Sequence, residues 1–111
     1  MDIKSCSKEL IENGVVVLRS FYNDREMSMI KNAINSAVAK PSPFKSFTKN
    51  SNGSFYMDFA NWRRVKELET ACKYKKTVDT LKELVGSEKC WLFHDHILIK
   101  SGEAPPTPWH H

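Results

Sequence analysis

The most regular hydrophobic pattern in the chain lies between residues 23 and 38. Apolar side chains recur there at steps of three and four residues, at Met27, Ile30, Ile34, Ala37 and Val38. A single apolar stripe with this spacing predicts an amphipathic helix. Asn23 and Glu26 have the spacing of a capping box, which places the start of the helix, and Pro41 prevents its continuation.

Weaker helical signals lie on both sides of this segment. A short helix is predicted to be capped by Ser5 or Ser7 and to end at Gly14. Residues 61–73 carry Trp62, Val65, Leu68 and Cys72 at helical spacing. Residues 77–85 predict a further helix that ends at Gly86.

Three other segments have the composition of β-strands. Residues 15–18 form a short β-branched run, residues 54–59 are rich in aromatic side chains, and residues 89–100 form the strongest strand signal. We expect the helix over 23–38 to pack through Ile30, Ile34 and Val38 against a sheet that contains residues 15–18. Residues 40–54 are rich in Lys, Ser, Pro and Asn and predict a long loop.

These elements predict one α+β domain over residues 1–111. The composition, with 41% hydrophobic and 27% charged residues, is that of an ordinary globular protein. The net charge of +4 comes from scattered lysines, which argues against a nucleic-acid interface. The chain has no apolar run of about 18 residues and no apolar signal region near Met1, so we expect a cytoplasmic protein without a membrane segment. Three cysteines without a CxxC motif predict free thiols.

All four histidines lie beyond residue 93. On the predicted strand, His94 and His96 lie two residues apart and therefore face the same side, together with Leu98 and Lys100. His110 and His111 are adjacent, so only one of them can face a given side of a strand. This arrangement is consistent with a metal or anion site between neighbouring strands. Two other interpretations stay open: His94 and His96 as polar groups lining a cavity, and His110 and His111 as residues of an expression tag.

Several motifs occur in an order that resembles a known family. The segment 96–100 ends in Lys100 and is followed by Gly102 and then by Thr107-Pro108-Trp109-His110. Residues 12–18, 21–38 and 58–64 fit, in order, an opening segment, a following helix and a middle segment. This series resembles the phytanoyl-CoA dioxygenase family and covers nearly the whole chain.

The resemblance implies the N-terminal helices and first strands of a double-stranded β-helix, the jelly-roll or cupin-like fold of this family. It implies a dioxygenase that uses Fe(II), 2-oxoglutarate and O₂ to hydroxylate a small organic or acyl substrate. Two histidines and one carboxylate hold the iron in such enzymes and leave positions open for 2-oxoglutarate and O₂.

Individual residues match the positions of the family's motif. His110 matches the first iron ligand, and we expect it on or beside a strand, facing His96 and Leu98. His96 matches a contact to 2-oxoglutarate, and Leu98 is a second candidate for lining that pocket. Lys100 matches the lysine at the end of the strand. Tyr56, Met57 and Asp58 fall near positions that contact cosubstrate or substrate.

The motif also predicts ligands that the chain does not contain. Its aspartate would be residue 112, and the second histidine and the arginine that anchors 2-oxoglutarate would lie further on. We therefore expect the 111 residues to be part of an oxygenase and to be inactive alone. The alternative is a non-catalytic binding or interaction module that has the same fold start and no iron site.

Overall fold

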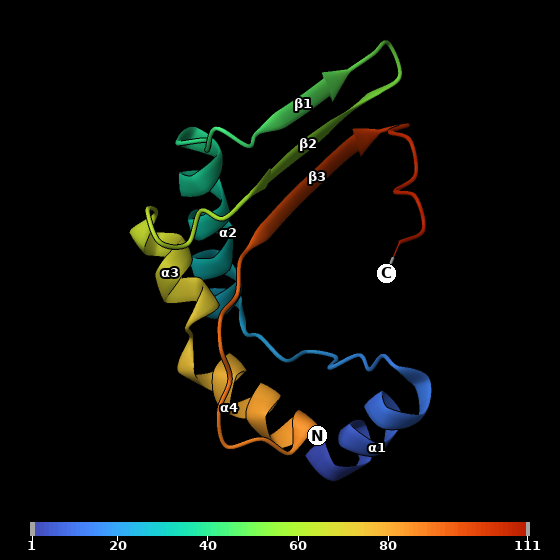
Figure 1. Ribbon diagram of the computed structural model, residues 1–111, viewed down its shortest axis with the longest axis vertical. Helices are drawn as coiled ribbons and strands as arrows, with labels where there is room; N and C mark the ends of the chain where they lie inside the picture. Colours follow the sequence, from blue (N-terminus) through green and yellow to red (C-terminus); the bar gives the residue numbers. More distant parts are fainter. Residues whose placement is uncertain (1, 111) are drawn as a thin grey trace.

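The protein consists of α-helices and an open, three-stranded antiparallel sheet (Figure 1). The computed structural model describes residues 2–110. The elements in chain order are α1 (Ile3–Asn13), α2 (Asp24–Ala39), β1 (Ser46–Lys49), β2 (Gly53–Phe59), α3 (Lys66–Cys72), α4 (Lys75–Val85) and β3 (His96–Gly102). The predicted α+β class is confirmed. None of the helices within residues 2–110 has the length and apolar character needed to cross a membrane.

The sheet has the strand order β1-β2-β3. A tight turn joins β1 to β2, where Asn50 Oδ1 accepts the backbone N–H groups of Asn52 and Gly53 at 2.8 Å. The predicted loop over residues 40–54 is therefore wrong from Ser46 onward, where β1, the turn and the start of β2 lie. Strand β1 is exposed along its whole length, so its conformation depends on pairing with β2 and leaves no hydrophobic signal in the sequence.

A small core lies between α2, α3 and the sheet. Its fully buried members are Ala33, Ala37, Val65, Leu68 and Ile97. Ile34 and Val38 are half-buried and pack against this cluster. The C-terminal part of the predicted apolar stripe of α2 thus faces the core, whereas Met27 at its start is 50% exposed. The alanines of α2 are its most deeply buried residues because they allow the close approach of α3.

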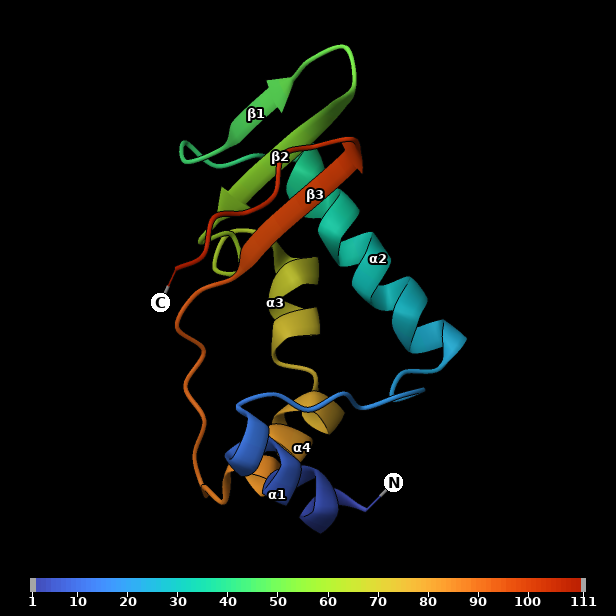
Figure 2. The ribbon, with the colours of Figure 1, turned by 90° about the vertical axis from the view of Figure 1, so that its right-hand side faces the viewer.

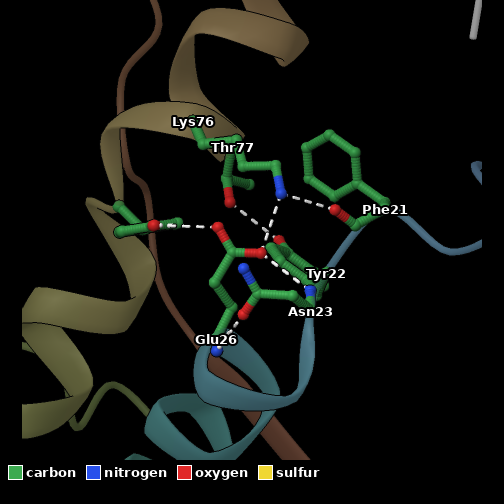
Figure 3. Close-up of polar contacts among 7 residues, drawn as sticks. Phe21, Tyr22, Asn23, Glu26, Lys76 and Thr77 are labelled. Carbon is green, nitrogen blue, oxygen red and sulfur yellow. Dashed lines mark hydrogen bonds and ion pairs between the residues drawn. The ribbon is translucent and has the colours of Figure 1, made fainter.

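A polar network ties the start of α2 to α4 (Figure 3). The predicted capping box is present: Asn23 Oδ1 accepts the N–H of Glu26 at 2.9 Å, and Glu26 Oε2 accepts the N–H of Asn23 at 2.8 Å. Glu26 also accepts hydrogen bonds from Lys76 Nζ at 2.8 Å and from the Tyr74 hydroxyl at 2.9 Å. The Lys76 hydrogen bond is the largest cause that lowers the pKa of Glu26 to about 2.

Residues 15–18 do not form the predicted strand. They are irregular, and Val15 and Val17 are 62% and 63% exposed. A β-branched run becomes a strand only where a neighbouring strand pairs with it, and this segment is not part of the sheet. Accordingly, Ile34 packs against the cluster of α2, α3 and β3 and not against a sheet that contains residues 15–18.

The predicted strand over 89–100 and helix over 61–73 both begin later than expected. β3 begins at His96 because its partner β2 ends at Phe59, the residue that pairs with His96. Just before β3, the buried Asp95 accepts the backbone N–H groups of Asn61 and Trp62 through Oδ1, both at 2.7 Å. These bonds hold the turn after β2, so α3 begins only at Lys66.

The ends of α1 and α4 follow the sequence signals in part. Asp2, rather than Ser5 or Ser7, caps α1 by accepting the N–H of Lys4 at 3.1 Å. α4 begins at Lys75, two residues before the predicted start. Both helices end at the predicted glycines, Gly14 and Gly86, which adopt the left-handed conformation.

Candidate functional site

The side of the sheet that faces away from α2 and α3, here called the outer sheet face, carries three of the four predicted site residues. Cross-strand pairs place His96 beside Phe59, Leu98 beside Met57, and Lys100 beside Phe55. Ile97 points toward the helices and is 7% exposed, so its neighbours in β3 point the other way. His96, Leu98 and Lys100 therefore share an exposed face, with α2 on the opposite side of the sheet (Figure 2).

A cluster of rings marks the start of β3. The ring centroids of His94 and His96 are 5.7 Å apart, and Phe59 lies 5.4 Å from His96 and 6.4 Å from His94. Together with Ala60 and Phe93, these rings line a shallow cleft of about 340 Å³. The two imidazoles lie close together although only His96 belongs to a strand. The cluster offers imidazole nitrogens next to apolar ring surface.

Lys100 fastens the segment after β3 to the sheet. Its Nζ donates hydrogen bonds to the carbonyl oxygen of Pro105 and to Thr107 Oγ1, each at 2.9 Å. The same ammonium group lies 5.0 Å from the centre of the Phe55 ring on the outer sheet face. The chain therefore turns back after Gly102, as Figure 2 shows, instead of leaving the sheet.

The strand expected around His110 is absent, because residues 103–110 are irregular. Three prolines in this segment remove the N–H groups that a strand ladder needs. The exposed His110 has its Nδ1 2.8 Å from the carbonyl oxygen of Pro108. A carbonyl only accepts, so Nδ1 is the donor in this contact and Nε2 is the ring nitrogen that a metal could bind, the arrangement that is common in metal-binding histidines. His111 lies outside the described residues.

The described residues do not form a complete metal site. Between residues 2 and 110, no group of three His, Cys, Asp or Glu side chains is placed to hold a metal ion. A facial iron site takes three protein ligands, and among the described residues the resemblance assigns only His110 to such a position. The ligand set implied by the resemblance is therefore not met by these residues alone.

The segment Tyr56–Asp58 has a structural role at Asp58. This carboxylate is fully buried on the helix side of the sheet and accepts the N–H and hydroxyl of Ser42. Burial is the largest single cause acting on the pKa of Asp58 and would raise it, but the hydrogen bonds from Ser42 together with those from neighbouring groups such as the Phe59 N–H lower the pKa below its usual value. Asp58 links the segment after α2 to β2. Its carboxylate lies on the helix side of the sheet and cannot contact a molecule bound on the outer sheet face, whereas Met57 lies on that face.

Asp95 is an important residue that the sequence analysis did not single out. Its position alternates with Phe93 and Ile97, so the sequence places a carboxylate on the apolar side of the predicted strand. A charged group in such a position needs buried hydrogen-bond donors, and it finds them in the turn after β2. The sequence signal for Asp95 is therefore a charged side chain at an apolar position of the predicted strand.

Comparison with known proteins gives no relative for this chain: no protein-family model matches it, and no match was found among curated proteins or solved structures. The relationship suggested by the motifs therefore stays a proposal.

Proposed function

We propose that this chain forms the first part of the catalytic domain of an Fe(II)- and 2-oxoglutarate-dependent dioxygenase that hydroxylates a small organic or acyl substrate. The observation that carries the proposal is the hydrogen bond between Lys100 and Thr107. These residues belong to two separate motifs of the resemblance, the strand-end lysine and the T-P-W-H segment. Their contact fixes Thr107, three residues before His110, beside the strand that carries His96 and Leu98.

The chemistry of the outer sheet face suits this role. His96 offers an imidazole to a carboxylate of 2-oxoglutarate, and Leu98, which is 49% exposed, offers an apolar surface to its carbon chain. The Nε2 lone pair of His110 is free to bind Fe(II). The remaining iron ligands, a carboxylate and a second histidine, must come from residues beyond 111, so the proposal requires a polypeptide that continues past this point.

The test uses the longest polypeptide that the reading frame encodes. With Fe(II) and O₂ it should convert 2-oxoglutarate to succinate, and His110→Ala should abolish both Fe(II) binding and this turnover. The circular dichroism spectrum of His110→Ala should match that of the wild type, because His110 is exposed and lies outside the core. His111→Ala, at the neighbouring position, is the matched control and should keep both activities.

The 111-residue chain alone provides a second measurement. Calorimetry with Mn(II) in place of Fe(II) should show weak binding that His110→Ala and His111→Ala affect equally, because a single imidazole forms no selective site. Tight binding that depends on His94 and His96 would contradict the assignment of His110. A reading frame that ends at His111, with no turnover, would favour the non-catalytic binding module.

A further inference from the structure

A second cleft lies on the helical side of the molecule. The elements around it are α3, α4 and the segment that runs from α4 to β3, whose arrangement Figure 1 shows. Its volume is about 560 Å³. The residues that matter here are Trp62, Arg63, Lys73, Leu81, Cys90 and Trp91, and we call this site the α3–α4 cleft. It contains none of the residues assigned to the proposed dioxygenase site.

Positive charge gathers at one side of the cleft around Trp62. The guanidinium carbon of Arg63 lies 5.0 Å from the centre of the Trp62 ring, and Lys73 Nζ lies 4.5 Å from it. Lys73 pairs with Glu69 at 2.8 Å, but Lys66 occupies the other oxygen of the same carboxylate at 3.0 Å. Because Glu69 is shared between two lysines, it neutralises only part of this charge. The cleft therefore has a net attraction for an anion.

Flat apolar surface lies beside this charge. Trp91 is 88% exposed and Leu81 is 47% exposed, and both border the cleft. A large exposed indole in a concave site is a typical contact for an aromatic ligand, since ring stacking removes apolar surface from water. The exposed indole of Trp91 thus supplies ring surface, while Arg63 and Lys73, held over the half-buried indole of Trp62, supply the charge.

We propose that the α3–α4 cleft binds a small aromatic carboxylate. The ring of the ligand packs against Trp91 and Leu81, and its carboxylate pairs with Arg63 and Lys73. Charge complementarity selects an anion over a neutral or cationic ring, and the indoles select a ring over a simple anion.

Cys90 provides a local reporter for this site. It is exposed and borders the cleft, whereas Cys6 lies on α1 and serves as an internal control. Alkylation by N-ethylmaleimide, followed residue by residue with mass spectrometry, measures the protection of each thiol. We expect 1-naphthoate to protect Cys90 and to leave Cys6 unchanged. Neither 1-naphthylmethylammonium, which reverses the charge, nor acetate, which lacks the ring, should protect Cys90.

Variants of the two cations test the assignment of the charge. Arg63→Gln and Lys73→Gln should each raise the naphthoate concentration for half-protection about two- to fivefold, the range expected for an exposed ion pair. Lys4→Gln, an exposed charge removed on α1, should change nothing. The alkylation rate of each variant without ligand serves as its own baseline. Absent protection, equal protection by the cationic analogue or acetate, or unaltered protection in both cleft variants would overturn the proposal.

Discussion

Gly102 and its ladder partner Gly53 lie at the end of the β2–β3 pair, where neither position has room for a Cβ. Gly102 has φ +63°, and a Cβ at this position would collide with the carbonyl oxygen of Asn52. A Cβ at Gly53 would likewise collide with the carbonyl oxygen of Ser101. Both constraints are imposed by backbone atoms, which cannot move aside as the end of a flexible side chain can.

Gly102→Ala should therefore lower the free energy of unfolding by about 1–3 kcal/mol, from a strained backbone conformation and a steric collision. Gly14→Ala is the matched control, since Gly14 has φ +72° but open space around it. It should cost only about 1–2 kcal/mol, from the left-handed conformation without a collision. Urea denaturation measures both variants, and equal losses would show that the contact between β2 and β3 adds no constraint.

The ion pair between Glu26 and Lys76 makes stability depend on pH. The pKa of Glu26 is about 2 in the folded protein, against its usual 4.5. Because the folded pKa is the lower one, this contribution is fully present above about pH 4.5 and is lost as the pH falls through about 2. Glu26→Gln should lower the urea midpoint at neutral pH and weaken its decline toward pH 2. Glu9→Gln, an exposed carboxylate on α1, should keep the wild-type pH profile.

The core-facing side chains of α2 and α3 differ in how deeply they are buried. Leu68 of α3 is 5% exposed, whereas Ile34 of α2 is only half-buried at the edge of the same cluster. Leu68→Ala should cost about 2–5 kcal/mol, because it removes buried contacts and leaves a cavity. Ile34→Ala should cost about half as much, since water can fill the space at the edge. Denaturation at equilibrium compares them, and a loss for Ile34→Ala as large as that for Leu68→Ala would contradict this ranking.

The elements that the sequence predicted well are those with local signals. α2 carries its periodicity and its capping box within its own residues, so both its type and its start were predictable. The failed strand over residues 15–18 and the missed strand β1 have the opposite property. Their conformation depends on whether another segment pairs with them, and that information lies elsewhere in the chain.

The same distinction holds for the candidate site. Strand alternation alone predicts that His96, Leu98 and Lys100 share one face, because alternation is a local property, and the register of β2 and β3 confirms it. The contact between Asp58 and Ser42 joins β2 to the segment after α2 and left no local signal. His110 was expected on or beside a strand, and it lies on none because the three prolines before it remove the N–H groups that a strand needs.

The molecule is less compact than most chains with this number of residues. Its radius of gyration is 16.0 Å, whereas a compact chain of this size has about 13 Å. The contacts form two groups: α1 packs on α4, and α2 packs on α3 near the sheet. The open shape leaves large apolar side chains exposed on both groups, including Val17, Val85 and Leu98.

Amide hydrogen exchange should reflect this division. α1 has no buried residue, so its amides should exchange fastest among the helices. Those of α2 and β2, which border the core, should exchange slowest. The Ser7 hydroxyl donates to the carbonyl oxygen of Leu84 at 2.7 Å, so Ser7→Ala should speed exchange in α1 further and leave β2 unchanged. Equal protection of α1 and β2 in the wild type would contradict the division.

The hydrogen bonds of Lys100 also set the local concentration of the His110 imidazole at the sheet. An extended chain from Gly102 to His110 reaches about 28 Å, whereas the chain from Thr107 to His110 reaches about 10 Å. Because Lys100 holds Thr107 in place, the volume open to the imidazole falls about twentyfold, and its effective concentration rises by the same factor. A group that binds on the outer sheet face therefore meets this imidazole as an intramolecular partner, with part of the entropy of bringing it there already lost when Lys100 binds Thr107.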